Sequence, residues 1–164
     1  AATRAAETLT VPAANLPYSS TNMSIQIDGR MTYADTSSLF EAKIYHWYED
    51  SLNNIYTALD TRSTRTGQVD FYQENGGVVD TVQGSGTSYS PGILVPFNLS
   101  SRHGATFLNA AIDGTALTVN TTPLALPDLS STNLDLGEVF MGTIAQFRMW
   151  DEDLTDAGIE KASE

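Results

Sequence analysis

Residues 69–82, VDFYQENGGVVDTV, contain the clearest structural signal in the chain. Val69 and Phe71 alternate with Asp70 and Tyr72, as in a β-strand with one buried face. Asn75-Gly76-Gly77 then provides residues that tolerate the positive φ of a tight turn. The second half alternates again around Asp80, so the stretch predicts a β-hairpin.

The same two-residue period extends over most of the remaining chain. It is clear at 23–28 (MSIQID) and 55–60 (IYTALD), and Asp113-Gly114 predicts a second hairpin joining 107–112 to 116–119. Further strands are expected at 8–11, 40–48, 94–99, 134–136 and 143–150. Only 156–162 has helical periodicity, with Thr155 as its expected N-cap. We therefore expect an all-β sandwich or jelly roll with a short C-terminal helix, forming a single domain over 1–164.

The charge balance excludes two classes of partner. Eight Lys and Arg stand against 20 Asp and Glu, for a net charge of −12. Nucleic acid and anionic membrane surfaces both require basic faces, so neither is an expected partner. No apolar run approaches the ~20 residues of a membrane-spanning helix, so membrane insertion is not expected either. The absence of cysteine excludes disulfides and thiol chemistry.

Catalytic and metal motifs are weak. His46 and His103 are far apart in the sequence, and neither lies in a recognisable catalytic pattern. A paired-carboxylate strand of the kind used by β-sandwich glycosidases is missing, so we expect no catalytic residues and no enzyme activity. No cofactor is expected either. Calcium stays possible, because four aspartates fall near predicted strand ends: Asp28, Asp50, Asp60 and Asp113.

One segment concentrates side chains suited to binding sugars. Residues 45–50 (YHWYED) are followed by Asn53-Asn54 and then by Arg62. Aromatic faces stack on sugar rings, and Asp, Asn and Arg bond to hydroxyl groups. In a strand, Tyr45 and Trp47 share one face and His46 and Tyr48 the other, so Trp47 either packs inside the sandwich or lies in a binding surface. The candidate glycan contacts are Trp47, Tyr48, Asp50, Asn54 and Arg62.

The C-terminal third resembles laminin-G-like, concanavalin A-like lectin/glucanase domains. Residues 107–114 (FLNAAIDG) resemble the strand–DG–strand hairpin of that family, and 134–137 (LDLG) its L-x-L-G strand. Residues 142–150 (GTIAQFRMW) and 153–159 (DLTDAGI) resemble its last strand and its closing L-S-x-A-E-I segment. The resemblance implies an all-β, two-sheet antiparallel jelly-roll sandwich whose usual task is binding, often of glycans. The catalytic motif of the glucanase branch is absent, so hydrolysis does not carry over.

The opening residues 3–11 (TRAAETLTV) are similar to the start of such domains in structural proteins of tailed phages. This resemblance implies a virion-surface module, in a head spike, decoration or tail-fibre protein, that recognises host cell-surface polysaccharide. Residues 1–7 are then a possible N-terminal arm, other virion proteins are partners, and analogy favours a homotrimer. The alternative is a purely structural capsid or tail protein that makes protein–protein contacts and binds no glycan.

Overall fold

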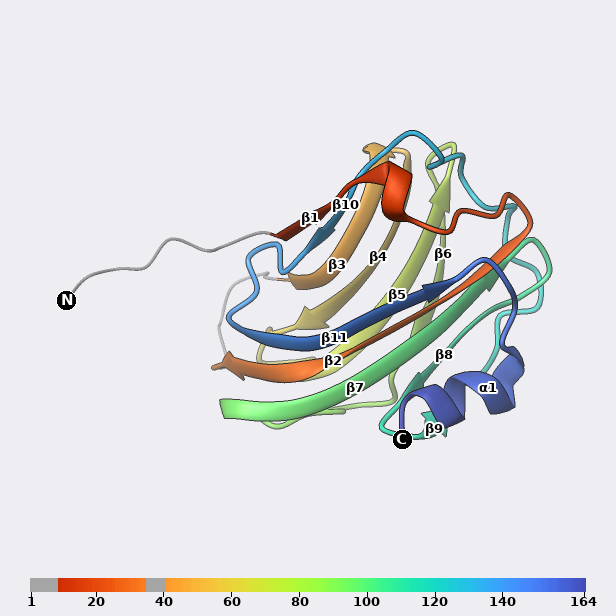
Figure 1. Cartoon of the computed structure of the whole chain (residues 1–164). Helices are drawn as coiled ribbons and strands as arrows, with labels where there is room; N and C mark the ends of the chain where they lie inside the picture. Colours follow the sequence, from red (N-terminus) through yellow and green to blue (C-terminus); the bar gives the residue numbers. More distant parts are fainter. Residues whose placement is uncertain (1–8, 35–40) are drawn as a thin grey trace.

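The computed structural model describes residues 9–34 and 41–164, which form two antiparallel sheets packed face to face (Figure 1). The six-stranded sheet has the order β1 (Leu9–Val11), β10 (Leu134–Leu136), β3 (Glu41–Asp50), β4 (Asn53–Asp60), β5 (Gln68–Asn75) and β6 (Val78–Gln83). The five-stranded sheet has the order β11 (Gly142–Trp150), β2 (Asn22–Tyr33), β7 (Gly92–Gly104), β8 (Leu108–Ile112) and β9 (Thr115–Ala116). A 3-10 turn, Ala13–Asn15, follows β1. The predicted all-β sandwich is confirmed, while the expected N-terminal arm lies outside the described residues.

Both predicted hairpins are present. Asn75 pairs with Val78 across the β5–β6 turn, where Gly76 and Gly77 have φ values of 60° and 80°. Asp113 and Gly114 have φ values of 47° and 79° in the β8–β9 turn. Two consecutive positive φ values match the right-handed twist of the flanking strands, which is why these residue pairs close two-residue hairpins. The second hairpin is shorter than predicted, because β9 contains only two residues.

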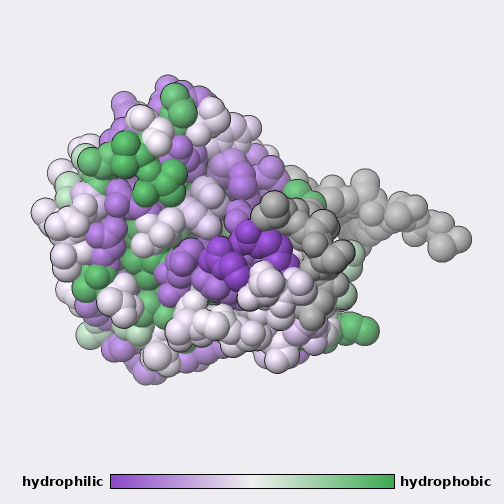
Figure 2. Space-filling view, turned by 180° about the vertical axis from the view of Figure 1, so that it is seen from behind, coloured by the Kyte–Doolittle hydropathy of each residue, from purple (hydrophilic) through white to green (hydrophobic). Residues whose placement is uncertain are grey.

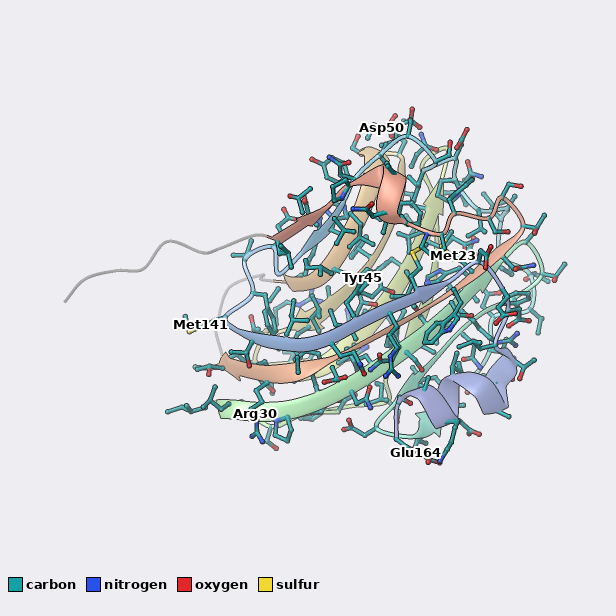
Figure 3. The ribbon with its side chains drawn as sticks, in the orientation of Figure 1. Met23, Arg30, Tyr45, Asp50, Met141 and Glu164 are labelled. Atoms are coloured by element: carbon teal, nitrogen blue, oxygen red, sulfur yellow. The ribbon has the colours of Figure 1, made fainter. Side chains whose placement is uncertain are left out.

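The space between the sheets is filled by large apolar side chains, including Met23 and Ile25 of β2 and Phe71 of β5. Tyr45 also lies between the sheets, whereas Asp50 lies at the end of β3 (Figure 3). Trp47 is completely buried on the same face as Tyr45, and its Nε1–H donates to the Thr132 carbonyl at 3.0 Å. The expectation that Trp47 contacts a glycan is therefore wrong, because burying its ring between two sheets leaves no surface for a ligand.

The C-terminal helix α1 (Thr155–Ala162) packs on the outer side of the five-stranded sheet, beside β7, β8 and β9 (Figure 1). Arg102 of β7 holds the segment through Asp153 and Asp156, with its Nη1 2.9 Å from Asp153 Oδ2 and its Nε 2.8 Å from Asp156 Oδ1. The prediction of Thr155 as N-cap is wrong: its side chain makes no cap, and its N–H donates to Asp153 Oδ1. No helix of the described chain is long and apolar enough to cross a membrane.

A buried histidine makes the stability of this fold dependent on pH. His103 is fully buried, with Nε2 3.1 Å from Ser101 Oγ and Nδ1 3.3 Å from Gln73 Oε1. Burial lowers the pKa of His103 from 6.5 to about 3. Between these values the unfolded chain takes up a proton that the folded chain refuses, so stability falls as the pH drops below 6.5.

We expect acidification from pH 7 to pH 5 to lower the free energy of unfolding by about 2 kcal/mol through His103. Urea denaturation of the native chain and of His103→Gln at both pH values measures this, because the variant has no group to titrate at this position. The pH-dependent loss should be about 2 kcal/mol larger in the native chain. Equal losses in the two proteins would show that His103 is not held neutral by the core.

Candidate functional site

The outer face of the six-stranded sheet bears a row of ring side chains. His46 and Tyr48 of β3 stack with ring centroids 4.5 Å apart, and Tyr56 of β4 meets His46 edge-on at 5.6 Å. Tyr56 in turn stacks on Tyr72 of β5 at 4.2 Å. Figure 2 views the molecule from this side and shows hydrophilic side chains gathered in the middle of the face. The row exists because β3, β4 and β5 are neighbours, and alternate residues point outward.

One end of this face is hollowed. The hollow has a volume of about 760 Å³ and is open to solvent. Five elements contribute to it: β1, β10, β3, β4 and β5, together with the β3–β4 turn and the segment after β10. We call this the outer-face hollow, and its lining residues are Thr10, Lys43, His46, Tyr48, Asp50, Ser51, Asn54, Tyr56, Glu74, Asp135 and Glu138.

Asn54 has an unsatisfied polar atom at the hollow. The side chain is 5% exposed, and its Nδ2 donates to Glu74 Oε2 at 2.9 Å. This bond identifies the nitrogen, because a carboxylate only accepts. Asn54 Oδ1 is buried and has no hydrogen-bond partner within the described structure. A buried acceptor without a donor costs free energy, so this oxygen, in a residue that lines the hollow, needs a donor from outside the chain, either water or a ligand hydroxyl or amide.

His46, Lys43 and Glu138 form a connected group on the wall of the hollow. His46 Nδ1 lies 2.8 Å from Glu138 Oε2, and Lys43 Nζ lies 3.1 Å from His46 Nδ1 and 3.3 Å from Nε2. The Glu138 carboxylate only accepts, so it assigns a proton to His46 Nδ1, and Nε2 is the ring nitrogen left to accept from the Lys43 ammonium. Burial lowers the pKa of His46, and the charge of Lys43 lowers it further. Burial alone would raise the pKa of Glu138, but the bond with His46 and the charge of Lys43 lower it overall.

The structure brings three of the predicted contacts together. Tyr48, Asp50 and Asn54 all line the hollow, and their role as glycan contacts stays a prediction. Asp50 also shapes the β3–β4 turn, because its Oδ1 accepts the Leu52 N–H at 2.8 Å. Lys43, His46, Tyr56, Glu74, Asp135 and Glu138 were not among the predicted contacts. Of these, only His46 had a sequence signal, since it alternates with Trp47 onto the face of Tyr48.

Arg62 lies elsewhere, at the other end of β4. Its Nε bonds to both oxygens of Asp60 at 2.9 and 2.8 Å, and Arg65 Nη2 bonds to Asp70 Oδ2 at 2.9 Å. Glu41 completes this ionic cluster. Arg62 is committed to Asp60 and does not line the hollow, so the structure does not place it with the other predicted contacts.

The four aspartates considered for calcium do not converge. Asp50 pairs with Asn53 at one end of the β3–β4 hairpin, whereas Asp60 pairs with Glu41 at the other. Asp28 and Asp113 belong to the other sheet and its β8–β9 turn. In the described part of the chain, Glu41, Asp60 and Asp70 do bring their carboxylates within 4.8 Å of one another. Arg62 pairs with Asp60 and Arg65 with Asp70, so two positive charges already stand against the three carboxylates of that cluster.

No family model matches the sequence, and no curated protein is similar to it. Solved structures are similar in fold. The CBM40 of the Ruminococcus gnavus IT-sialidase, bound to α2,3-sialyllactose, aligns with a TM-score of 0.66 at 12% identity, over 87% of this chain and 82% of that one.

Two further solved structures align with most of this chain, which spans less than half of the length of either one. The binding domain of botulinum neurotoxin serotype D aligns with a TM-score of 0.71 at 14% identity, over 96% of this chain and 40% of that one. The leech intramolecular trans-sialidase aligns with a TM-score of 0.64 at 16% identity, over 88% and 23%. Identities this low show the fold alone, and the chain has the jelly-roll, lectin-like fold of carbohydrate-binding modules and toxin binding domains.

Proposed function

We propose that this protein is a glycan-binding module whose ligand occupies the outer-face hollow. The observation that carries the proposal is the buried, unpartnered Oδ1 of Asn54 at the hollow. Sugar hydroxyl groups can donate to it. The stacked rings of His46 and Tyr48 supply an apolar surface beside these polar groups, which suits the mixed faces of a sugar.

The proposed role is binding without turnover. Glycoside hydrolysis requires a carboxylic acid that stays protonated near neutral pH. Glu138 is the opposite case, because His46 and Lys43 stabilise its charged form and lower its pKa. A carboxylate held in this state is suited to accepting hydrogen bonds from hydroxyl groups. Structural neighbours whose names describe carbohydrate-binding and toxin binding domains support the same role.

A virion surface is the setting that we propose for this binding, with host cell-surface polysaccharide as the ligand. Its support is the resemblance of residues 3–11, of which 3–8 lie outside the described residues. None of the structural neighbours reported above is a phage protein, so the fold similarity adds no support for this setting. The homotrimer and the contacts with other virion proteins rest on the same resemblance.

Two substitutions test the proposed site. Tyr48→Ala removes an exposed ring, and Asn54→Ala removes the unpartnered acceptor. Each should weaken binding to a glycan identified on a printed array by about three- to tenfold, the effect of losing one ring contact or one hydrogen bond. Leu52→Ala is the matched control, because Leu52 is 51% exposed on the β3–β4 turn but does not line the hollow.

Calorimetric titration of the folded variants separates the outcomes. Thermal denaturation first establishes that each variant is folded, since Asn54 also bonds to Glu74. Weakened binding in Tyr48→Ala and Asn54→Ala with unchanged binding in Leu52→Ala supports the site. Equal affinities in all four proteins would show that glycans, if bound, are held on another surface.

A further inference from the structure

The charges in the outer-face hollow are strongly unbalanced. Four carboxylates line it: Asp50, Glu74, Asp135 and Glu138. Among the residues that the structure describes, Lys43 is the only lysine or arginine in the lining. His46 adds no charge at neutral pH, because burial and Lys43 lower its pKa. The hollow therefore has a negative potential, in a chain whose net charge is −12.

The ammonium group of Lys43 already has partners in the hollow. Lys43 Nζ lies 3.5 Å from Glu138 Oε2 and 3.3 Å from His46 Nε2. It also lies 5.0 Å from the centre of the Tyr56 ring, within the range of a cation–π contact. A ligand carboxylate would have to compete with all three partners for this ammonium group.

The hollow also has an excess of hydrogen-bond acceptors. Asn54 Oδ1 has no donor in the described structure. Glu74, Asp135 and Glu138 each use one carboxylate oxygen, accepting from Asn54, Thr10 and His46 respectively. Their second oxygens have no hydrogen-bond donor among the residues that the structure describes. A ligand that fits must bring donors, and a carboxylate brings only further acceptors.

From this combination of charge and acceptors, and on the basis of the proposed function, we infer that the hollow selects uncharged glycans and rejects glycans whose contacting unit carries a carboxylate, such as sialic or uronic acids. Neutral sugars offer several hydroxyl donors and do not experience repulsion from the four carboxylates. This specificity differs from that of the R. gnavus module, which has the same fold and is bound to sialyllactose.

The test uses pairs of glycans that differ only in a carboxylate. One arm compares neutral oligosaccharides with their uronate counterparts, and the other compares them with their sialylated forms, by calorimetry on the full chain at pH 7. Where a neutral glycan binds, its anionic partner should bind at least about tenfold more weakly in about 50 mM salt. The difference should narrow in about 500 mM salt, because ions screen the repulsion, while the affinity for the neutral glycan stays constant.

Two charge variants, one inside the hollow and a matched control outside it, test the role of the carboxylates. Glu138→Gln keeps the size of the side chain and removes one negative charge, so the difference between neutral and anionic partners should shrink by about threefold. Glu164→Gln removes one negative charge at the C-terminus, outside the hollow, and should leave the difference unchanged.

The possible outcomes test the inferred specificity and the proposed glycan binding separately. A preference for neutral partners that narrows in high salt and in Glu138→Gln, together with binding that Tyr48→Ala weakens, supports the inferred specificity. Equal or tighter binding of the anionic partner, still weakened by Tyr48→Ala, overturns the inferred specificity and leaves glycan binding in place. Failure of every glycan to bind, or binding that ignores Tyr48→Ala, overturns the proposed function and the inference with it.

Discussion

Replacing Trp47 by alanine is expected to lower the free energy of unfolding by about 3–5 kcal/mol. The ring is fully buried between the sheets and meets Tyr18 edge-on, with centroids 5.8 Å apart. Its loss opens a cavity and leaves the Thr132 carbonyl without the donor that Nε1 provides at 3.0 Å. Urea denaturation at pH 7 with a far-ultraviolet circular dichroism signal measures the loss.

Two variants show where the energy comes from. Trp47→Phe keeps much of the ring and removes the Nε1 donor, so it should cost clearly less than Trp47→Ala. Tyr48→Ala changes the next residue, whose side chain is 44% exposed on the opposite face of β3, and should cost under about 1 kcal/mol. Similar losses at positions 47 and 48 would contradict the assignment of the two faces.

The faces of β3 illustrate what the sequence could not determine. Tyr45 and Trp47 alternate with His46 and Tyr48, so both faces contain aromatic rings and the two-residue period alone favours neither as the buried one. Distant contacts decide: Tyr45 Oη lies 2.9 Å from Ser101 Oγ in the other sheet, and Trp47 bonds to Thr132. The strand itself was predictable because alternation is a local property.

The candidate site also has a part that the sequence could predict and a part that it could not. Tyr48, Asp50 and Asn54 could be grouped from sequence because one tight hairpin, β3–β4, holds all three close together. Asp135 and Glu138 join them only because β10 pairs with β3, far away in sequence. The prediction grouped Arg62 with these residues wrongly, because it follows β4 and the whole length of that strand separates it from the hollow. The unpartnered oxygen of Asn54 is a property of the folded state alone.

Gly67→Ala is expected to destabilise the fold by at least about 3 kcal/mol, although the change adds a single methyl group. Gly67 precedes β5 and has a φ of 74°, where residues with a Cβ are strained. A Cβ here would also overlap the Tyr89 carbonyl oxygen. That oxygen is fixed, because it accepts the Tyr33 hydroxyl at 2.6 Å while the Ser88 and Tyr89 N–H groups bond to the Gly67 carbonyl.

Gly76→Ala separates the strain from the overlap. Gly76 has a φ of 60° in the β5–β6 turn, and a Cβ there would meet nothing within 4 Å. Gly76→Ala should lower the free energy of unfolding by only about 1–2 kcal/mol, the cost of holding a residue with a Cβ in the left-handed region. Urea denaturation of the two variants measures the difference, which is the cost of pushing apart the segments that Gly67 joins. Equal losses would mean that the segment around Tyr89 moves away from an added Cβ at no cost, and that the close approach at Gly67 contributes nothing to stability.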